Sequence, residues 1–374
     1  MKRVIYADNA ATTKLDIEAF EAMKPWLLDS YGNASQPYFF SRKPKEALKR
    51  ARQTIASCIN ADPEEIYFTS GGTESDNWAI KGTMYAHQNH QGLITSQVEH
   101  HAILHSAAAV ERMGYPVTYL PVNSECVVLP NYLQESITDK TKVISVMLSN
   151  NEVGTIQPIK ELAGIAHAHG IIFHTDAVQA VGHIMIDVKK LGVDMLSASA
   201  HKFNGPKGIG FLYVKKGTDL RPFNDGGTQE HGMRAGTENV ASIVGMAVAL
   251  ENNCDQLEEH QKHILSLEEE LISGLSHAGL DFIRNGSKNH VPGNISLSFK
   301  DVDGEMLLHR LDLMGVCVST GSACDSKNTQ ISHVLKAMRV PEEYSRGTIR
   351  ISLGKDNTSE EVNTIIKNIQ KILL

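Results

Sequence analysis

Short apolar runs alternate with longer amphipathic stretches through the first two-thirds of the chain. The apolar runs have the length and the composition of buried strands. Helical spacing of apolar positions separates them, for example at 45–59 and 159–169. This alternation predicts an α/β fold with a mostly parallel sheet flanked by helices, in which ligands bind beyond the carboxyl ends of the strands. Strands are predicted at 66–69, 92–95, 117–120, 143–148, 171–174, 193–198 and 211–214.

The pattern changes in the last third of the chain. A long helical stretch over 239–275 includes a charge-rich section at 255–270. We therefore expect a large α/β domain over 16–255, and a smaller α+β domain formed by 1–15 together with 256–374. The smaller domain is predicted to contain strands at 294–299 and 348–353 and helices at 305–314 and 360–373.

Composition narrows the class of protein. The chain has 374 residues, of which 41% are hydrophobic and 21% charged, as in an ordinary globular protein. Its net charge of -7 gives no electrostatic reason to expect nucleic acid or a membrane surface as a ligand. No apolar run approaches the ~20 residues of a membrane span, and the first residues lack a secretory signal. Five scattered cysteines without paired metal spacing predict unpaired thiols in a reducing cytoplasm.

The most informative segment is Ser199-Ala200-His201-Lys202, which ends the predicted strand at 193–198. A glycine-rich turn at 205–210 follows it. A lysine held at a strand end inside an apolar site can lose its proton near neutral pH and attack an aldehyde. The segment therefore offers Lys202 as a candidate Schiff-base lysine, although an ordinary solvated lysine would fit the same segment.

Two further strand ends carry candidate chemistry. Gly71-Gly72-Thr73 opens a helix after the strand at 66–69. The bare backbone N–H groups of this segment favour an anion such as a phosphate. An ordinary capped helix would use the same residues. Asp176 follows the strand at 171–174. Its carboxylate would suit a pyridinium N–H, or it would serve as a helix cap.

In this order, these features resemble the pyridoxal-phosphate enzymes of fold type I, and most closely the cysteine desulfurases, the NifS/IscS-like branch of the class V aminotransferase family. The resemblance covers nearly the whole chain. It rests on the glycine, aspartate and lysine segments above and on matching motifs at 6–13, 31–35, 98–100, 150–154, 234–237, 321–324 and 348–354.

The resemblance implies roles for the cofactor-binding residues. Lys202 would hold pyridoxal 5′-phosphate as a Schiff base and move protons between the substrate Cα and C4′ of the cofactor. Asp176 would pair with the pyridine nitrogen and Gln179 with the ring hydroxyl, while His100 would stack on the ring and exchange a proton. The phosphate would be bound by Gly72, Thr73, Ser199 and His201. Thr237 would join them from the other subunit, so the resemblance also implies a homodimer.

Substrate binding and sulfur transfer are expected in the last third of the chain. Ile349, Ile351 and Leu353 share one face of a strand, so Arg350 projects from the other. By the resemblance, Arg350 would clamp the α-carboxylate of L-cysteine with help from Asn151. Cys324, in a small polar stretch at 319–327, would accept the substrate sulfur as a persulfide. Cys317, between two valines, is expected to be a buried core thiol.

Two departures from the family pattern stand out. Asp325 follows Cys324 where relatives usually carry a small hydroxyl residue, and a neighbouring carboxylate should make the thiol less reactive. The chain also stops soon after its final helix, without the C-terminal extension that helps many IscS-type relatives to dock scaffold proteins. The identity of the sulfur acceptor therefore stays open.

The resulting hypothesis is a cytoplasmic, homodimeric cysteine desulfurase that converts L-cysteine to L-alanine. Its persulfide would pass to an acceptor protein for iron–sulfur cluster assembly or thiolation. Alternatives are selenocysteine lyase, another class V lyase or transaminase, and a noncatalytic scaffold. No metal site is expected: His101 and His105 have helical zinc spacing, but Ala102 stands where a zinc protease would have glutamate.

Overall fold

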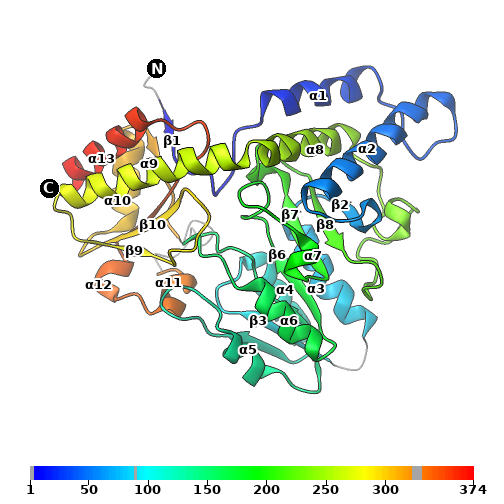
Figure 1. The fold of residues 1–374 in the computed structure, drawn as a ribbon, viewed down its shortest axis with the longest axis horizontal. Helices are drawn as coiled ribbons and strands as arrows, with labels where there is room; N and C mark the ends of the chain where they lie inside the picture. Colours follow the sequence, from blue (N-terminus) through cyan, green and yellow to red (C-terminus); the bar gives the residue numbers. More distant parts are fainter. Residues whose placement is uncertain (1–3, 88–90, 322–330) are drawn as a thin grey trace.

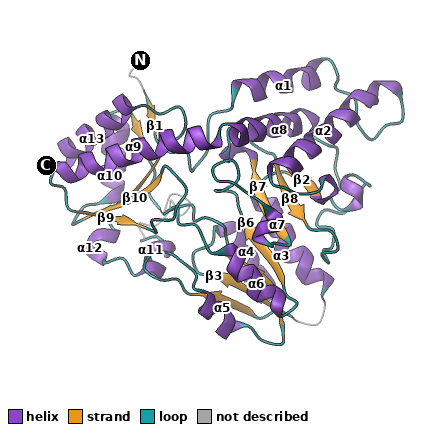
Figure 2. Ribbon diagram, viewed as in Figure 1, coloured by secondary structure: helices purple, strands orange, loops and turns teal. Residues whose placement is uncertain are grey.

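The computed structural model describes residues 4–87, 91–321 and 331–374. Its main feature is a seven-stranded sheet (Figures 1 and 2). Strand β8 is antiparallel to its two neighbours, and the remaining neighbouring pairs are parallel, which confirms the predicted mostly parallel sheet. The strands lie in the order β2 (Ile66–Thr69), β8 (Gly210–Val214), β7 (Met195–Ser199), β6 (Ile172–Asp176), β5 (Thr141–Ser145), β3 (Gly92–Ser96) and β4 (Val117–Leu120).

Helices flank this sheet, as the amphipathic spacing predicts. The α3 helix packs against β7 and β8, and α6 packs against β6. The helices of this part are α1 (Ile17–Leu28), α2 (Arg42–Cys58), α3 (Gly72–Ala86), α4 (His101–Arg112), α5 (Pro130–Ser136), α6 (Ile159–Ala168), α7 (Val188–Leu191) and α8 (Val240–Asp255). Short 3-10 turns lie at Phe39–Ser41, Pro63–Glu65, Ala200–Lys202 and Glu230–Gly232.

A second, smaller assembly surrounds a three-stranded antiparallel sheet in the order β12-β10-β9. A two-stranded parallel pair, β1 (Ile5–Tyr6) with β11 (Val316–Cys317), lies beside it. The other elements are α9 (Leu257–His277), β9 (Phe282–Asn285), β10 (Asn294–Phe299), α10 (Gly304–Leu313), α11 (His333–Met338), α12 (Glu342–Ser345), β12 (Thr348–Ser352) and α13 (Ser359–Leu373). None of the helices in the described ranges combines the length and apolar character that a bilayer span requires.

Local sequence explains why these elements begin where they do. Asp303 caps α10 through the N–H of Met306, and Thr358 forms a capping box with Glu361 at the start of α13. Four apolar residues at helical spacing form the buried face of α13. They are Val362, Ile365, Ile366 and Ile369.

The two largest hydrophobic cores correspond to the two larger sheets. Ile243, Met246 and Leu250 of α8 belong to the core of the seven-stranded sheet. Ile264 and Leu271 of α9 belong to the core of the three-stranded sheet. From this separation we infer that 16–255 forms one domain, and 1–15 with 256–374 another. The α11 helix nevertheless contributes apolar side chains to the first core.

The structure corrects two details. Strand β5 ends at Ser145 rather than at residue 148. The next backbone N–H that faces β3 is that of Met147, and it donates to the Glu99 carboxyl instead of to a carbonyl of β3. The predicted buried thiol of Cys317 is partly exposed, since β11 has only two residues and pairs along one edge with β1.

Candidate active site

Lys202 lies on the 3-10 turn that directly follows β7. Its Nζ donates to the carbonyl oxygens of Ala10 at 2.5 Å and Ala11 at 2.9 Å. The N-terminal segment therefore crosses the end of β7 and holds the amine. Gln179, which follows β6, donates its Nε2 to the same Ala10 oxygen at 3.0 Å, so the structure brings Gln179 and Lys202 together.

Asp176 is the last residue of β6, the strand next to β7. Its carboxylate is buried, and its Oδ1 accepts the Val178 N–H at 2.9 Å. Burial raises the pKa of Asp176 to about 6, although the Val178 N–H and the Lys202 charge act in the opposite direction. The carboxylate therefore lies near the lysine, in a setting that favours a cationic partner.

His100 caps the N-terminus of α4, where its Nδ1 accepts the Ala102 N–H at 3.1 Å. The neutral ring consequently carries its proton on Nε2. Burial and, to a smaller extent, the Lys202 charge lower the pKa of His100 to about 4. The imidazole is therefore neutral in the physiological range.

One ligand atom each of Asp76, His100 and Asp176 lies within 4.8 Å of the other two. Asp76 belongs to α3 and is fully buried, and its Oδ1 has no hydrogen-bond partner in the described part of the chain. Burial and the Asp176 charge raise the pKa of Asp76. These three side chains could hold a cation, and the N–H of a bound ring could equally serve as the partner of the buried carboxylates.

The predicted phosphate cup lies at the start of α3. Gly71 has φ of 147°, a backbone conformation that favours glycine. A Cβ atom on Gly72 would lie 2.6 Å from Cγ2 of Val178 and 3.7 Å from Cβ of Ser199. The helix N-terminus therefore lies directly against the ends of β6 and β7, and Thr73 is exposed in its first turn.

His201 also lies at this end of β7. Its Nδ1 is 3.1 Å from the Thr12 hydroxyl, and burial together with the Lys202 charge lowers the pKa of the His201 ring to about 4. The neutral ring can therefore offer a hydrogen bond without adding charge. Thr237, by contrast, is exposed in the loop that precedes α8.

Arg350 lies in β12, the strand predicted for it, and its side chain is buried. Its Nη2 pairs with Oδ1 of Asp8 at 2.8 Å, and its Nη1 donates to the backbone carbonyl of Asn151 at 2.8 Å. The Nε atom has no partner in the described part of the chain. A substrate carboxylate bound by Arg350 would therefore compete with Asp8 for the guanidinium. The sequence did not indicate the contact between Asp8 and Arg350.

Cys324 and Asp325 lie outside the described residues, but the chain on both sides of them is described. The backbone of Ser319 pairs with Arg350 in an antiparallel bridge. A Cβ on Gly321 would touch the buried carboxyl of Glu152, which accepts a hydrogen bond from Ser332 at 2.6 Å. Both ends of the segment that carries Cys324 therefore meet at Glu152, near Arg350.

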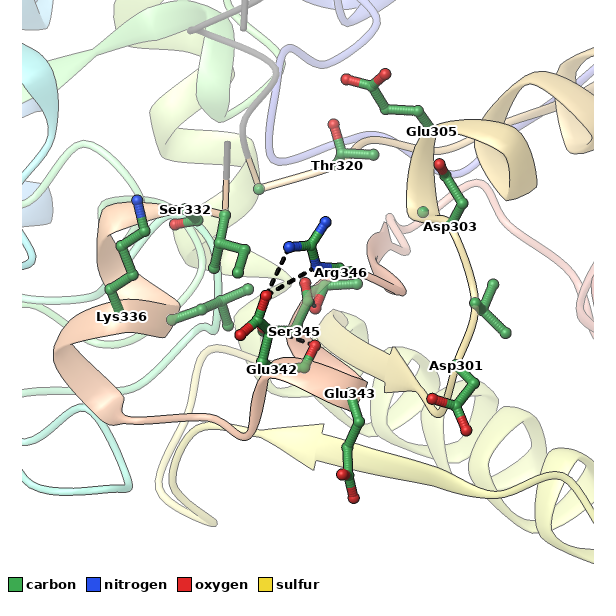
Figure 3. A pocket seen from close by; sticks show the side chains of 16 residues that line it. Asp301, Asp303, Glu305, Thr320, Ser332, Lys336, Glu342, Glu343, Ser345 and Arg346 are labelled. Atoms are coloured by element: carbon green, nitrogen blue, oxygen red, sulfur yellow. Dashed lines mark hydrogen bonds and ion pairs between the residues drawn. The ribbon is translucent and has the colours of Figure 1, made fainter. Parts of the chain in front are cut away.

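A pocket of about 520 Å³ lies beside these ends (Figure 3). Thr320 and Ser332 line it, and the Glu342 carboxylate points toward the Arg346 guanidinium across it. Lys202 and Asp176 do not line this pocket. It is therefore separate from the lysine and aspartate group.

Sequence reasoning missed several residues that complete the site. Asp8 lies within the motif at 6–13, and Asp76 lies three residues after Thr73, but the sequence assigned neither a role. Glu99 was overlooked as well, although burial raises its pKa to about 8. The feature that could have pointed to Glu99 is its position directly before His100, shortly after the strand predicted at 92–95.

Comparisons with known proteins agree with this geometry. The chain matches the family described as aminotransferase class-V over residues 5–365. It is 48% identical to a cysteine desulfurase IscS from Dictyoglomus turgidum, across 100% of this chain and 95% of that relative. A solved NifS-like protein superposes with a TM-score of 0.94 at 38% identity, covering 99% of both chains. A structure described as SspA in complex with cysteine gives a TM-score of 0.84 at 36% identity, covering 96% of this chain and 100% of that one.

The chain therefore belongs to the class V aminotransferase family. The predicted family and the fold type I architecture are confirmed. Because this family depends on pyridoxal 5′-phosphate, the predicted cofactor is confirmed as well.

The residues at the site fit this cofactor. The buried Asp176 carboxylate suits a ring N–H, the neighbouring amine of Lys202 suits an aldehyde, and the tight glycine turn before α3 suits a phosphate. The pairing of Asp76 and Asp176, two carboxylates in a buried space, gives the same preference for a cationic ring.

Proposed function

We propose that this protein is a cysteine desulfurase that converts L-cysteine to L-alanine and transfers the sulfur to Cys324. The observation that carries the proposal is the approach of the Lys202 amine and the Asp176 carboxylate, at the ends of the neighbouring strands β7 and β6, to the His100 ring at the start of α4. The relatives named as cysteine desulfurases and the neighbour named as a cysteine complex support the substrate.

Bound pyridoxal phosphate would supply an aldehyde for exchange with the substrate amine and a protonated ring that withdraws electrons from Cα. Lys202 holds the cofactor at rest and, once displaced, takes the proton from the substrate Cα. Asp176 keeps the ring nitrogen protonated, and Gln179 donates to the ring hydroxyl. Because Nδ1 of His100 is occupied by a backbone N–H, any proton exchange by His100 uses Nε2.

The remaining residues anchor the cofactor and the substrate. Gly72, Thr73, Ser199 and His201 bind the phosphate through the α3 N-terminus and the end of β7. Arg350 binds the α-carboxylate of the substrate, which replaces Asp8 as the acceptor of the Nη2 hydrogen bond. The backbone carbonyl of Asn151 holds Nη1 in place.

Sulfur transfer requires the Cys324 thiolate, which lies a few residues after Ser319, the residue that pairs with Arg350. The Cys324 thiolate attacks the substrate sulfur, a sulfur–sulfur bond forms, and the carbon–sulfur bond breaks with its electron pair left on the alanine carbon skeleton. The carboxylate of Asp325 disfavours the thiolate, so we expect a modest nucleophile.

We further propose that the enzyme works as a cytoplasmic homodimer and passes the persulfide to an acceptor protein, for iron–sulfur cluster assembly or a thiolation pathway. The exposure of Thr237 supports a dimer in which each Thr237 reaches the cofactor phosphate of the other copy. The pocket beside the Cys324 segment is a surface that an acceptor could approach.

Mass spectrometry of the holoenzyme after addition of L-cysteine tests the function. We expect one additional sulfur on the peptide that contains Cys324, and no such addition in the Cys324→Ser variant. Cys317→Ser, which removes a partly exposed thiol elsewhere, should leave the Cys324 persulfide unchanged.

Wild-type formation of alanine and sulfide by Cys324→Ser would contradict the persulfide route. Retained turnover of selenocysteine alone by that variant would instead favour the selenocysteine lyase alternative.

A further inference from the structure

Two cysteines that are far apart in the sequence meet beside the large core. Cys58 is the last residue of α2, and Cys254 lies in the last turn of α8. These two helices pack against each other (Figure 1). Both cysteines are partly exposed and line the same cavity of about 290 Å³. The two thiols are close enough to influence each other's ionisation.

Their surroundings make the thiols chemically unequal. The neighbouring Cys58 thiol lowers the pKa of Cys254, while the neighbouring Cys254 thiol and burial raise the pKa of Cys58. Burial and the carboxylates of Asp255 and Glu251 limit the lowering at Cys254. A thiolate supported by a neighbouring thiol is the arrangement in which one cysteine attacks a disulfide and the other resolves it.

We propose that Cys58 and Cys254 form a redox-active dithiol that closes to a disulfide between α2 and α8. Neither cysteine belongs to the proposed active site, so this inference does not depend on the proposed function. The shared cavity and the packing of α2 on α8 place the two thiols where a disulfide would need little backbone movement.

A metal is the other ligand that a cysteine pair could take. In the described ranges, the cluster of three or more candidate ligands is Asp76, His100 and Asp176, which includes neither cysteine. Two thiolates alone leave a tetrahedral zinc site incomplete. The geometry therefore favours disulfide formation.

The oxidant would be a low-molecular-weight disulfide. The Cys254 thiolate attacks one of its sulfurs, forms a mixed disulfide and releases the first small thiolate. Cys58 loses its proton to water and attacks the Cys254 sulfur, which releases the second small thiolate. The two cysteines are thereby oxidised by two electrons, and the small disulfide is reduced to two thiols.

The position of the pair suggests what closure would change. Cys254 lies two residues before Gln256, where α8 ends and α9 begins. The α8 helix belongs to the first hydrophobic core and α9 to the second. A disulfide to α2 would therefore fix the chain just before it passes between the cores.

Peptide mapping of the holoenzyme tests the proposal. The protein is incubated with 2-hydroxyethyl disulfide, its remaining thiols are alkylated, and its peptides are compared before and after reduction. We expect the Cys58 and Cys254 peptides to be linked, with a loss of about 2 Da relative to their summed masses. In Cys58→Ser the small thiol should stay attached at Cys254, because the resolving cysteine is missing.

The matched control is Cys317→Ser, which removes another partly exposed thiol and should leave the linkage unchanged. Recovery of Cys58 and Cys254 as separate alkylated peptides from the oxidised wild-type protein would overturn the proposal. So would a linkage of either cysteine to another partner. Because the decisive measurement uses the wild-type protein, poor folding of a variant would not obscure it.

Discussion

At the scale of single residues, the site depends on buried acids and bases that are kept uncharged or paired. Asp176 and Glu99 have raised pKa values because they are buried, and His100 has a lowered one for the same reason. Arg350 is paired with Asp8. The site therefore has several groups whose ionisation is sensitive to what binds beside them.

Glu99 gives a test of this electrostatic arrangement through stability. Burial raises the pKa of Glu99 to about 8 from an ordinary value of 4.5, so the folded protein holds this proton more tightly than the unfolded chain does. Between these two pH values the unfolded chain ionises first, and stability falls as pH rises, by up to about 1.4 kcal/mol per pH unit. Below the window both states are protonated, and above it both are ionised.

We therefore expect Glu99→Gln to flatten the decline in unfolding free energy between pH 4.5 and about 8. Urea denaturation of cofactor-free protein at a series of pH values measures this decline. Glu111→Gln, at an exposed position of α4, should keep the wild-type profile. Parallel profiles for wild type and Glu99→Gln would show that Glu99 does not take up a proton in this range.

The chemistry of single residues was predictable where local sequence determines it. Lys202 and Asp176 follow apolar runs directly, so their positions at neighbouring strand ends could be inferred from sequence. The contact between Asp8 and Arg350 joins residues at opposite ends of the chain. Such a contact depends on the completed fold, and no local pattern could have predicted it.

At the scale of secondary structure, the strands were more predictable than their ends. Strands β2, β4 and β10 occupy the predicted residues, because short runs rich in apolar and β-branched residues, bounded by polar residues, glycine or proline, define them clearly. The predicted helix over 239–275 is two helices that meet at Gln256, where neither glycine nor proline marks a break. The break lets α8 and α9 bury their apolar faces in different cores.

The start of α3 provides a prediction at this scale. In Gly72→Ala the new methyl group would lie 2.6 Å from Val178 Cγ2, so the helix must move away from the ends of β6 and β7. Because this junction forms the proposed phosphate cup, we expect the Kd for pyridoxal phosphate to rise about 10-fold or more. Equilibrium dialysis of cofactor with apoprotein measures the change.

Gly164→Ala in α6 is the matched control, since nothing lies within 4 Å of its added Cβ. That substitution should stabilise the protein by about 0.5–1 kcal/mol and leave the cofactor Kd unchanged. Unaltered affinity in Gly72→Ala would mean that the phosphate does not bind at this helix end.

At the scale of the whole molecule, the site combines residues from both hydrophobic cores. Lys202 and Asp176 belong to the seven-stranded sheet and the turn after it, whereas Arg350 belongs to the three-stranded sheet. The N-terminal segment links them, because Asp8 contacts Arg350 while Ala10 contacts Lys202. Relative movement of the two cores would therefore change the distance between the proposed cofactor and substrate groups.

A mixed dimer tests the proposed assembly. One chain carries Lys202→Ala, the other carries Thr237→Ala, and the mixed species is isolated through two different affinity tags. If Thr237 serves the opposite subunit, the chain with Thr237→Ala has an intact Lys202 and receives an intact Thr237 from its partner. We therefore expect one site per mixed dimer with wild-type cofactor affinity and about half of the wild-type turnover.

The parent Thr237→Ala dimer provides the comparison. Loss of one hydrogen bond to a charged phosphate should raise its cofactor Kd about 10- to 100-fold. A mixed dimer of Lys202→Ala with Thr228→Ala, a change at another exposed threonine, should also retain one wild-type site. If the Lys202→Ala and Thr237→Ala pair binds cofactor as weakly as the Thr237→Ala parent, Thr237 acts within its own chain. If no mixed species can be isolated, the protein does not form the dimer that completes the site.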